Sequence, residues 1–237
     1  MKEKLIFGKG NAKLDKSIYT FSLPAGHTCP FANECFSKAN KNTGRLEDGK
    51  AMKFRCFSAS AENLYPTVRR SRWKNYDILK GKSIEEMVEI IKNSLPKNAK
   101  MIRLHVSGDF FSSLYFRAWA LVAKDNPNII FYGYTKSLPF WIAYKHLVPS
   151  NFKLTASIGG MKDNLVNLFS LKNARVVFTE EEAKKLKLDI DHDDSHAYKG
   201  DKSFALLLHG VQPPGTLASK ALSELKRKKI KHSYSKK

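Results

Sequence analysis

Cysteine is scarce in this sequence, and long apolar runs are absent. Only three cysteines occur in 237 residues, and no apolar stretch reaches the roughly 18 residues that a membrane-spanning helix needs. The first residues, MKEKLIFGKGNAKLDKS, lack the apolar centre of a secretory signal. We therefore expect a cytoplasmic protein without disulfides, because thiols stay reduced in that compartment.

Acidic residues are also few. The chain has 22 Asp and Glu against 42 Lys and Arg, which gives a formal net charge of +20. Such an excess attracts polyanions, and nucleic acid, with DNA favoured, is the partner we expect. A membrane surface is not expected, because the basic run near the C-terminus has almost no apolar face. That run contains Lys226, Arg227, Lys228 and Lys229.

The apolar pattern predicts an α/β fold. Apolar runs read as six strands and alternate with helical patterns, which indicates a parallel sheet. A partial (βα)6 barrel is favoured over an open doubly wound sheet. We expect a single domain over residues 1–225 and a basic, disordered tail over 226–237. The six expected strands cover residues 18–23, 101–107, 128–135, 152–158, 174–178 and 203–209.

The helical patterns carry recognisable start signals. Ser83 precedes Glu86 by three residues, which is the pattern of a capping box, and Thr179 is placed to cap the helix that follows it. Ser113 is expected at the start of another helix. The expected helices cover residues 60–79, 83–95, 113–125, 139–147, 163–171 and 180–186, with a last one from 219 into the tail.

All three cysteines fall in residues 27–58, here called the cysteine loop. Cys29 and Cys35 are separated by five residues, and Cys56 follows after twenty more. Clustered thiols in a cytosolic chain indicate metal binding, although three small buried side chains are the plainer interpretation. An iron–sulfur cluster, 4Fe–4S in particular, would leave one iron open. Zinc is the alternative, with His27 as a fourth ligand.

Polar residues cluster where the expected strands end, which is where parallel α/β sheets carry their active sites. Strand alternation places Arg103, His105 and Ser107 on one face. Asp109 follows them, and it is a candidate catalytic residue together with His105. The alternative for Asp109 is a helix cap. The candidate cofactor-binding residues are Ser107, Gly108, Thr135 and Ser157.

Two further segments are rich in charged residues, one of them acidic and the other basic. Residues 191–196 hold three Asp and two His, which is a possible divalent-cation site for a nuclease but is more typical of a solvated loop. Residues 65–76 interleave arginines with aromatic residues, as nucleic-acid-binding surfaces do, although the aromatic side chains could equally pack in the core. The candidate nucleic-acid contacts are Arg69, Arg70, Arg72, Lys74 and Lys136, besides the basic run 226–229.

Several unusual motifs occur in an order that resembles the gene product 88 family of bacteriophage and plasmid proteins, over roughly residues 18–160. The resemblance implies a mobile-element origin and a host cytoplasmic location, but no activity. The motifs are Phe21-Ser-Leu-Pro-Ala-Gly26, Cys29-Pro, Cys35, Thr43-Gly44, Asp48-Gly49, Arg55-Cys56, Tyr65-Pro66, Arg72-Trp73, His105-Val-Ser-Gly-Asp-Phe110 and Phe131-Tyr-Gly-Tyr-Thr135.

The layout is also similar to that of radical S-adenosylmethionine enzymes, which carry three cluster cysteines after the first strand of a partial barrel. Their compact cysteine spacing is absent here. This similarity implies S-adenosylmethionine as a ligand, with Gly108 and Asp109 near its amino group. The leading hypothesis is an iron–sulfur enzyme that modifies nucleic acid. The alternatives are a zinc-stabilised, non-catalytic DNA-binding protein in replication or regulation, and a divalent-metal nuclease.

Overall fold

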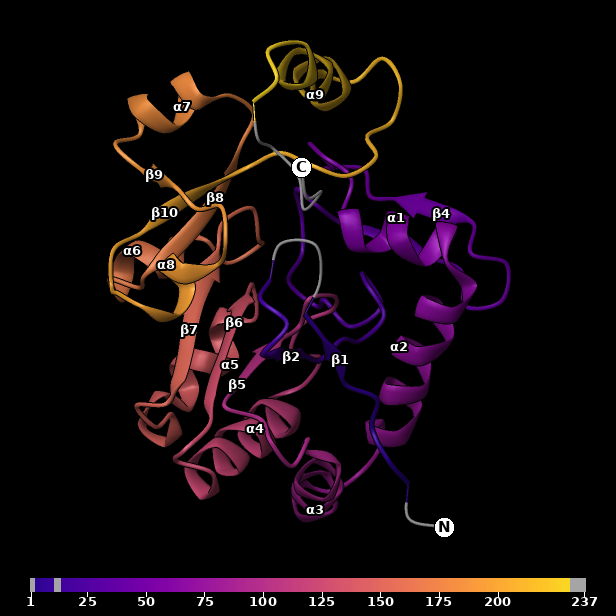
Figure 1. Ribbon diagram of the computed structural model, residues 1–237, viewed down its shortest axis with the longest axis vertical. Helices are drawn as coiled ribbons and strands as arrows, with labels where there is room; N and C mark the ends of the chain where they lie inside the picture. The colour runs from indigo at the N-terminus through magenta and orange to yellow at the C-terminus, as the bar shows by residue number, and fades with distance from the viewer. Residues whose placement is uncertain (1–2, 11–13, 231–237) are drawn as a thin grey trace.

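The computed structural model describes residues 3–10 and 14–230, and it shows a mixed α/β fold around one large sheet (Figure 1). Eight strands of these residues form that sheet. In spatial order they are β1 (Gly8–Lys9), β2 (Ile18–Thr20), β5 (Met101–Leu104), β6 (Ile130–Thr135), β7 (Phe152–Ser157), β8 (Asn173–Val177), β10 (Phe204–Leu207) and β9 (Asp189–Ile190).

The six strands expected from the sequence lie side by side in chain order. Each pairs in parallel with the next, from β2 through β5, β6, β7 and β8 to β10. A doubly wound sheet reverses its strand order at a switch point, and no such reversal occurs within these six. The sheet is open, because the described strands do not close into a barrel.

Short strands that the sequence did not indicate extend the fold. β1 pairs antiparallel with β2 at one edge, and β9 lies beyond β10 at the other. The cysteine loop is not wholly irregular as expected, because β3 (Ser37–Ala39) and β4 (Leu46–Asp48) form a hairpin within it. The Asn40 side chain accepts from the amides of Asn42 and Thr43, which closes the hairpin turn.

Helices connect the parallel strands, as expected. Residues 60–79 do not form one helix, because Pro66 cannot donate the hydrogen bond that continuity requires and starts a new helix instead. The helices are α1 (Phe57–Leu64), α2 (Pro66–Leu79), α3 (Ile84–Ser94), α4 (Ser113–Asp125), α5 (Leu138–Ala143), a 3-10 turn (Lys145–Leu147), α6 (Asn164–Leu168), α7 (Glu180–Lys185), α8 (Ser195–Tyr198) and α9 (Leu217–Arg227).

The helix starts follow side-chain capping. Ser83 and Glu86 form the expected capping box on α3, and Thr179 caps α7 as expected. α4 is capped by Ser112 rather than by Ser113, which is its first helical residue. α9 runs to Arg227, so the expected tail begins inside a helix, and residues 231–237 lie outside the described part. No described helix is long and apolar enough to cross a membrane.

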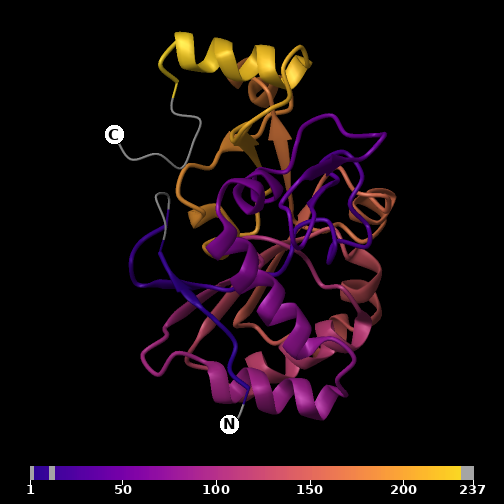
Figure 2. The same ribbon diagram turned by 90° about the vertical axis from the view of Figure 1, so that its right-hand side faces the viewer.

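One face of the sheet is covered by helices. Ile102, Leu104 and Phe131 from the sheet pack with Trp119 of α4 and Ile91 of α3 in the largest core cluster. Figure 2 shows α3 at one end of the molecule and α9 at the other, with β8 pointing toward α9. The strand ends that carry the candidate residues therefore face the α9 end.

The other face of the sheet is concave and is filled by residues 191–198, here called the plug segment. Ile18 of β2 and Phe204 of β10 share one core cluster with Ala197 of the plug segment. The first and last of the six strands therefore meet the same packed group, which requires the sheet to curl. The plug segment contacts both β6 and β7 through α8.

A buried ion pair holds the plug segment in place. The Arg103 guanidinium on β5 lies 2.5 Å from the Asp194 carboxylate, and the Tyr134 hydroxyl donates to the same carboxylate. Asp191 accepts from the amides of Asp194 and His196. The expectation of a solvated acidic loop is therefore wrong for Asp191 and Asp194, which are buried and bonded internally.

We predict that Asp194→Asn lowers the free energy of unfolding by about 3 kcal/mol, because it removes one charge of the buried Arg103–Asp194 ion pair. Asparagine tolerates the left-handed conformation of this position, where φ is 67°. Asp193→Asn is the matched control, since Asp193 is exposed, and it should change stability by less than about 1 kcal/mol. Urea denaturation measures both, and equal small losses would contradict the prediction.

Candidate functional site

A cavity of about 160 Å³ lies at the carboxyl ends of the parallel strands, and we call it the cysteine cavity. All three cysteines line it, together with residues that follow β5, β6 and β10. The sheet and the cysteine loop thus form opposite walls. The candidate residues that line the cavity are Cys29, Cys35, Cys56, His105, Ser107, Gly108, Asp109, Lys136 and Ser157.

The cysteine loop is held against the sheet by close backbone contacts. Ala32 pairs with Gly160, and the Glu34 amide donates to the Gly159 carbonyl, so the loop docks on the turn after β7. Near Cys56, the Gln212 side chain accepts from the Arg55 amide and donates to the Arg55 carbonyl. The segment after β10 therefore fixes the position of the third cysteine.

The three thiols influence one another electrostatically. Burial raises the pKa of Cys29 well above its ordinary value, and the neighbouring Asp109, Cys56 and Cys35 raise it further. Burial, with Cys35 next, raises the pKa of Cys56 to about 11. The thiols of Cys29 and Cys56 are therefore neutral at pH 7. Among the described residues, no group of three or more His, Cys, Asp or Glu is arranged to hold a metal ion.

Asp109 ties the ends of β5 and β6 together. Its carboxylate accepts from the Thr135 hydroxyl at 2.6 Å, from the Phe110 amide at 2.7 Å and from the Lys136 amide at 2.8 Å. Burial raises the pKa of Asp109, while these hydrogen bonds oppose the rise. Thr135 thus lies behind Asp109 and does not line the cavity. Asp109 does not cap α4, because Ser112 does.

His105 interrupts the alternation expected along β5. The strand ends at Leu104, and His105 adopts a left-handed conformation with φ of 57°. Its ring packs edge-on against Phe110 at 4.5 Å, and Nε2 lies 3.1 Å from the Tyr115 hydroxyl. Burial, aided by Arg103, lowers the pKa of His105 to about 3. A neutral imidazole therefore stands at the cavity wall, and His105 does not share one continuous strand face with Arg103 and Ser107.

Glu62 of α1 supports the residues around the cavity through hydrogen bonds. Its place on the Ser- and Ala-rich face of α1 is the only sign of this role in the sequence. Its Oε1 atom accepts from the Ala25 amide, from the Ser107 hydroxyl and from the Arg72 guanidinium. Glu62 is fully buried. Ser107 therefore holds its hydroxyl toward this carboxylate. Gln212 and Arg55 were also missed, because their contact joins residues that are far apart in the sequence.

The arginines of α2 divide into internal and exposed groups. Arg69 donates to the carbonyls of Lys41, Asn42 and Glu62, and Arg72 pairs with Glu62, so both are buried. Both guanidinium groups are thus turned into the protein and bonded there. Arg70 and Lys74 are exposed and line a shallow hollow of about 410 Å³ on the surface.

His27 lies away from the cysteine cavity. Its Nε2 atom is 2.9 Å from the Ala39 carbonyl, and its ring packs on Trp73 at 4.8 Å. His27 does not line the cavity. The three thiols therefore have no histidine from this part of the loop beside them.

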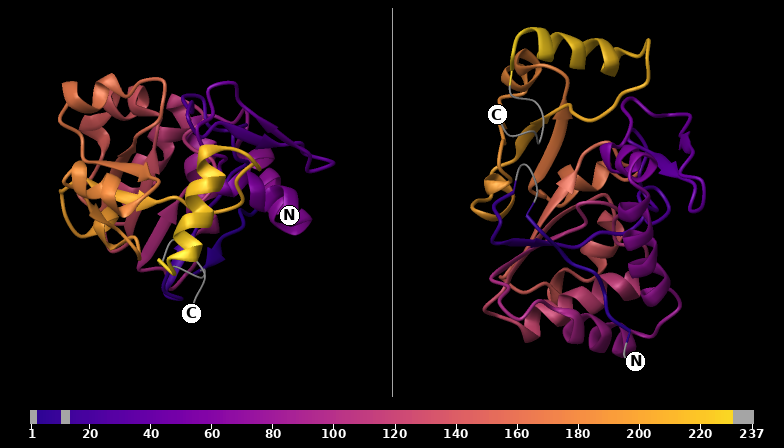
Figure 3. Two further views of the ribbon diagram at one scale, coloured as in Figure 1. Left: turned by 90° about the horizontal axis from the view of Figure 1, so that it is seen from above. Right: turned by 45° about the vertical axis from the view of Figure 1, so that its right-hand side comes forward.

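The basic run lies on a helix that adjoins the cavity wall. α9 packs through Ala218 and Leu222 against Leu208 and Val176, and the last two residues line the cysteine cavity. Seen from above, α9 lies between the β8–α7 segment and the cysteine loop (Figure 3). The exposed Lys226–Lys229 run is therefore at the same end of the molecule as the cavity.

Comparison with known proteins identifies the family. The model of the family described as Gene product 88 matches residues 2–232. The chain belongs to the gene product 88 family. The family match covers nearly the whole chain, so it extends well beyond the motifs of residues 18–160. No solved structure matches this gene product 88 protein, and the comparisons do not support the similarity to radical S-adenosylmethionine enzymes.

Two phage proteins are among the relatives. The Gene 88 protein of Mycobacterium phage L5 is 28% identical over 90 residues, and that of Mycobacterium phage D29 is 30% identical over 90 residues. Each match covers 34% of this chain and 38% of the relative. The matched part thus spans less than half the length of either curated relative.

We predict that Gly108→Ala destabilises the protein by about 2–3 kcal/mol and disturbs the cysteine loop. A Cβ atom at Gly108 would lie 2.7 Å from Leu23 Cβ and 2.5 Å from Thr28 Oγ1, at a φ of +80°. Gly81→Ala is the control, because Gly81 has a similar φ of +75° but no atom within 4 Å. It should cost only about 1 kcal/mol of backbone strain. Thermal denaturation that ranked the two variants equally would contradict the prediction.

Proposed function

We propose that this gene product 88 protein is an iron–sulfur enzyme that acts on nucleic acid, with its cluster on Cys29, Cys35 and Cys56. One observation carries the proposal: three thiols that are widely spaced in the chain line one cavity at the carboxyl ends of parallel strands. These ends are where α/β enzymes carry their reactive groups. The other lining residues supply hydrogen-bonding groups around that centre.

The donor set fits an iron–sulfur cluster better than a structural zinc. Thiolates are soft ligands that suit both, but a structural zinc needs a closed set of four. The nearest histidine in the sequence, His27, is turned to Trp73 and Ala39 instead. A cluster held by three thiolates alone would leave one iron open to a small molecule. When bound, such a cluster supplies electrons to that molecule.

Cluster binding would require the three thiols to lose their protons, because metals bind thiolates. The raised pKa values of Cys29 and Cys56 describe the protein before this happens. A bound cation reverses that electrostatic preference. The cysteines would then hold the cluster, while Asp109 stays fixed opposite them by its three hydrogen bonds.

The arrangement of the strands supports a partial-barrel interpretation. The six parallel strands follow chain order, and both ends of this set contact the plug segment. A cysteine loop after the first strand and a Gly-Asp turn after the second agree with the layout of radical S-adenosylmethionine enzymes. We therefore include S-adenosylmethionine as the candidate ligand of the open iron, by analogy with the order of elements in those enzymes.

Nucleic acid is the proposed substrate because of the charge and its placement. The chain carries a net charge of +20, and a run of four exposed basic residues lies on and just after α9, which adjoins the cavity wall. A phosphate backbone bound there would bring bases to the cavity mouth. A phage-encoded enzyme of this kind would work in the host cytoplasm.

We predict that protein purified without oxygen contains iron and absorbs visible light. Replacing Cys29, Cys35 or Cys56 by alanine should each abolish both signals. His27→Ala is the control: it should keep the iron, whereas a zinc site completed by His27 would lose its metal. A colourless preparation without iron would contradict the proposal, and one zinc per chain would select the zinc-stabilised DNA-binding protein.

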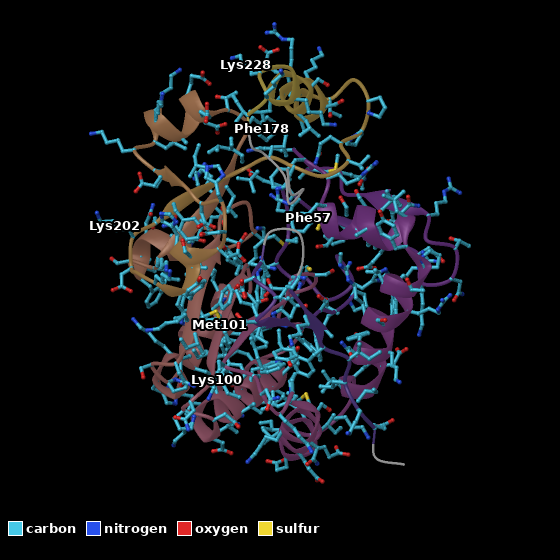
Figure 4. All side chains as sticks on the ribbon, viewed as in Figure 1. Phe57, Lys100, Met101, Phe178, Lys202 and Lys228 are labelled. Carbon is cyan, nitrogen blue, oxygen red and sulfur yellow. The ribbon has the colours of Figure 1, made fainter. Side chains whose placement is uncertain are left out.

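We predict that DNA affinity falls steeply with salt and depends on the basic run. Replacing Lys228 and Lys229 by glutamine should lower the slope of log affinity against log salt by about 0.9 per lost phosphate contact. Lys97→Gln with Lys100→Gln is the control of equal charge, since both residues are exposed and Lys100 lies far from Lys228 (Figure 4). Equal losses in the two double variants would show that net charge alone drives binding.

A further inference from the structure

Lys136 is a buried lysine whose ammonium contacts only neutral groups. It follows β6, is 8% exposed and lines the cysteine cavity. Its Nζ atom donates to the Ser157 hydroxyl at 2.6 Å and to the Ile158 carbonyl at 3.2 Å. Within the described chain, no carboxylate lies within ion-pair distance of this ammonium. A buried charge without a counter-charge is unfavourable by several kcal/mol unless something compensates it.

The other cations of the cavity wall have such compensation. Arg103 pairs with Asp194, and Arg55 pairs with Asp48. The Asp109 carboxylate interacts electrostatically with Lys136, but it accepts a hydrogen bond from the Lys136 amide and forms no ion pair with the ammonium. The backbone of Lys136 thus bonds toward β5, while its side chain reaches β7.

Two hydrogen-bond donors remain at this point of the cavity. An ammonium has three donors, and Lys136 uses two of them. The Ser157 hydroxyl accepts from Lys136 and keeps its own hydrogen for another acceptor. One cationic and one neutral donor side by side match an oxyanion, which accepts through two oxygens.

We propose that Lys136 and Ser157 bind the oxyanion group, a carboxylate or a phosphate, of a small molecule that occupies the cysteine cavity. This rests on the proposed function in taking the cavity as the ligand site, but it requires no metal. The volume of about 160 Å³ is below that of pockets for whole drug-sized ligands and suits the amino-acid-sized, oxyanion-bearing part of a ligand.

The same burial separates Lys136 from the nucleic-acid surface. Its ammonium lies inside the cavity wall, whereas Arg70, Lys74 and the run 226–229 are exposed. A duplex backbone cannot reach a lysine that is 8% exposed. Lys136 therefore serves the small ligand rather than the phosphates of DNA, and Lys136→Met should leave the salt slope of DNA binding unchanged.

The test uses the full chain prepared without metal, with inorganic phosphate and acetate as probes at constant ionic strength. Calorimetry should show that one of them binds, and which one binds identifies the oxyanion class. Lys136→Met should weaken that binding at least tenfold, and Ser157→Ala about threefold. Lys153→Met, on the neighbouring strand and exposed, is the matched control and should bind as the unmodified protein does.

We expect the Lys136→Met variant to fold. Methionine is close to lysine in length and removes a buried charge that forms no ion pair, so Lys136→Met should melt close to the unmodified protein. The proposal is overturned if neither probe binds, or if Lys136→Met binds as tightly as Lys153→Met. It is also overturned if Lys136→Met does not fold and Ser157→Ala binds normally. If protein purified without oxygen contains no iron, while the metal-free protein binds the probe through Lys136, the cluster is refuted and this site stands.

Discussion

The buried carboxylate of Glu62 connects the parts of the molecule that form the cavity. One of its oxygens accepts from Ala25 just before the cysteine loop, from α2 and from the segment after β5. A buried charge is tolerated only when donors surround it. The loop, the helix and the strand end must therefore all be in place together, and the cavity between them follows from that requirement. Arg72 supplies the compensating charge, which is why it lies inside.

Charge has two separate uses in this protein. Four basic side chains are buried and bind internal acceptors, namely Arg69, Arg72, Arg103 and Lys136. The exposed basic residues of α2 and α9 instead contribute to the electrostatic field outside the protein. The net charge of +20 therefore overstates what a polyanion would meet at any one place. The exposed run on and after α9 adjoins the cavity wall, so a polyanion bound there would lie at the same end of the molecule as the cavity.

The sequence predicts the larger elements because their physics is local. Six apolar runs give the six parallel strands, Ser83 and Thr179 mark helix starts, and the strand-end rule brings Asp109 and the cysteines to one edge. Elements of two to four residues, such as β9 and α8, are too short for a period to be visible.

The remaining differences come from long-range contacts. Arginines on a helix normally face water, so the burial of Arg69 and Arg72 could not be read from spacing. The left-handed His105 breaks an alternation that its neighbours suggest. The sequence predicts a solvated loop for Asp191 and Asp194, because it does not reveal that their partners are backbone amides or side chains of other segments. The oxyanion donors Lys136 and Ser157 meet only when β6 and β7 pair.

The contact between Gln212 and Arg55 has a consequence for synthesis. These residues are 157 positions apart, so Cys56 gains its final support only after the chain has been synthesised through Gln212. The part of the loop with Cys29 and Cys35 can dock only after β7 has formed, whereas Cys56 needs the segment after β10. The three thiols therefore come to their final positions only after β7 and the segment after β10 have both joined the fold.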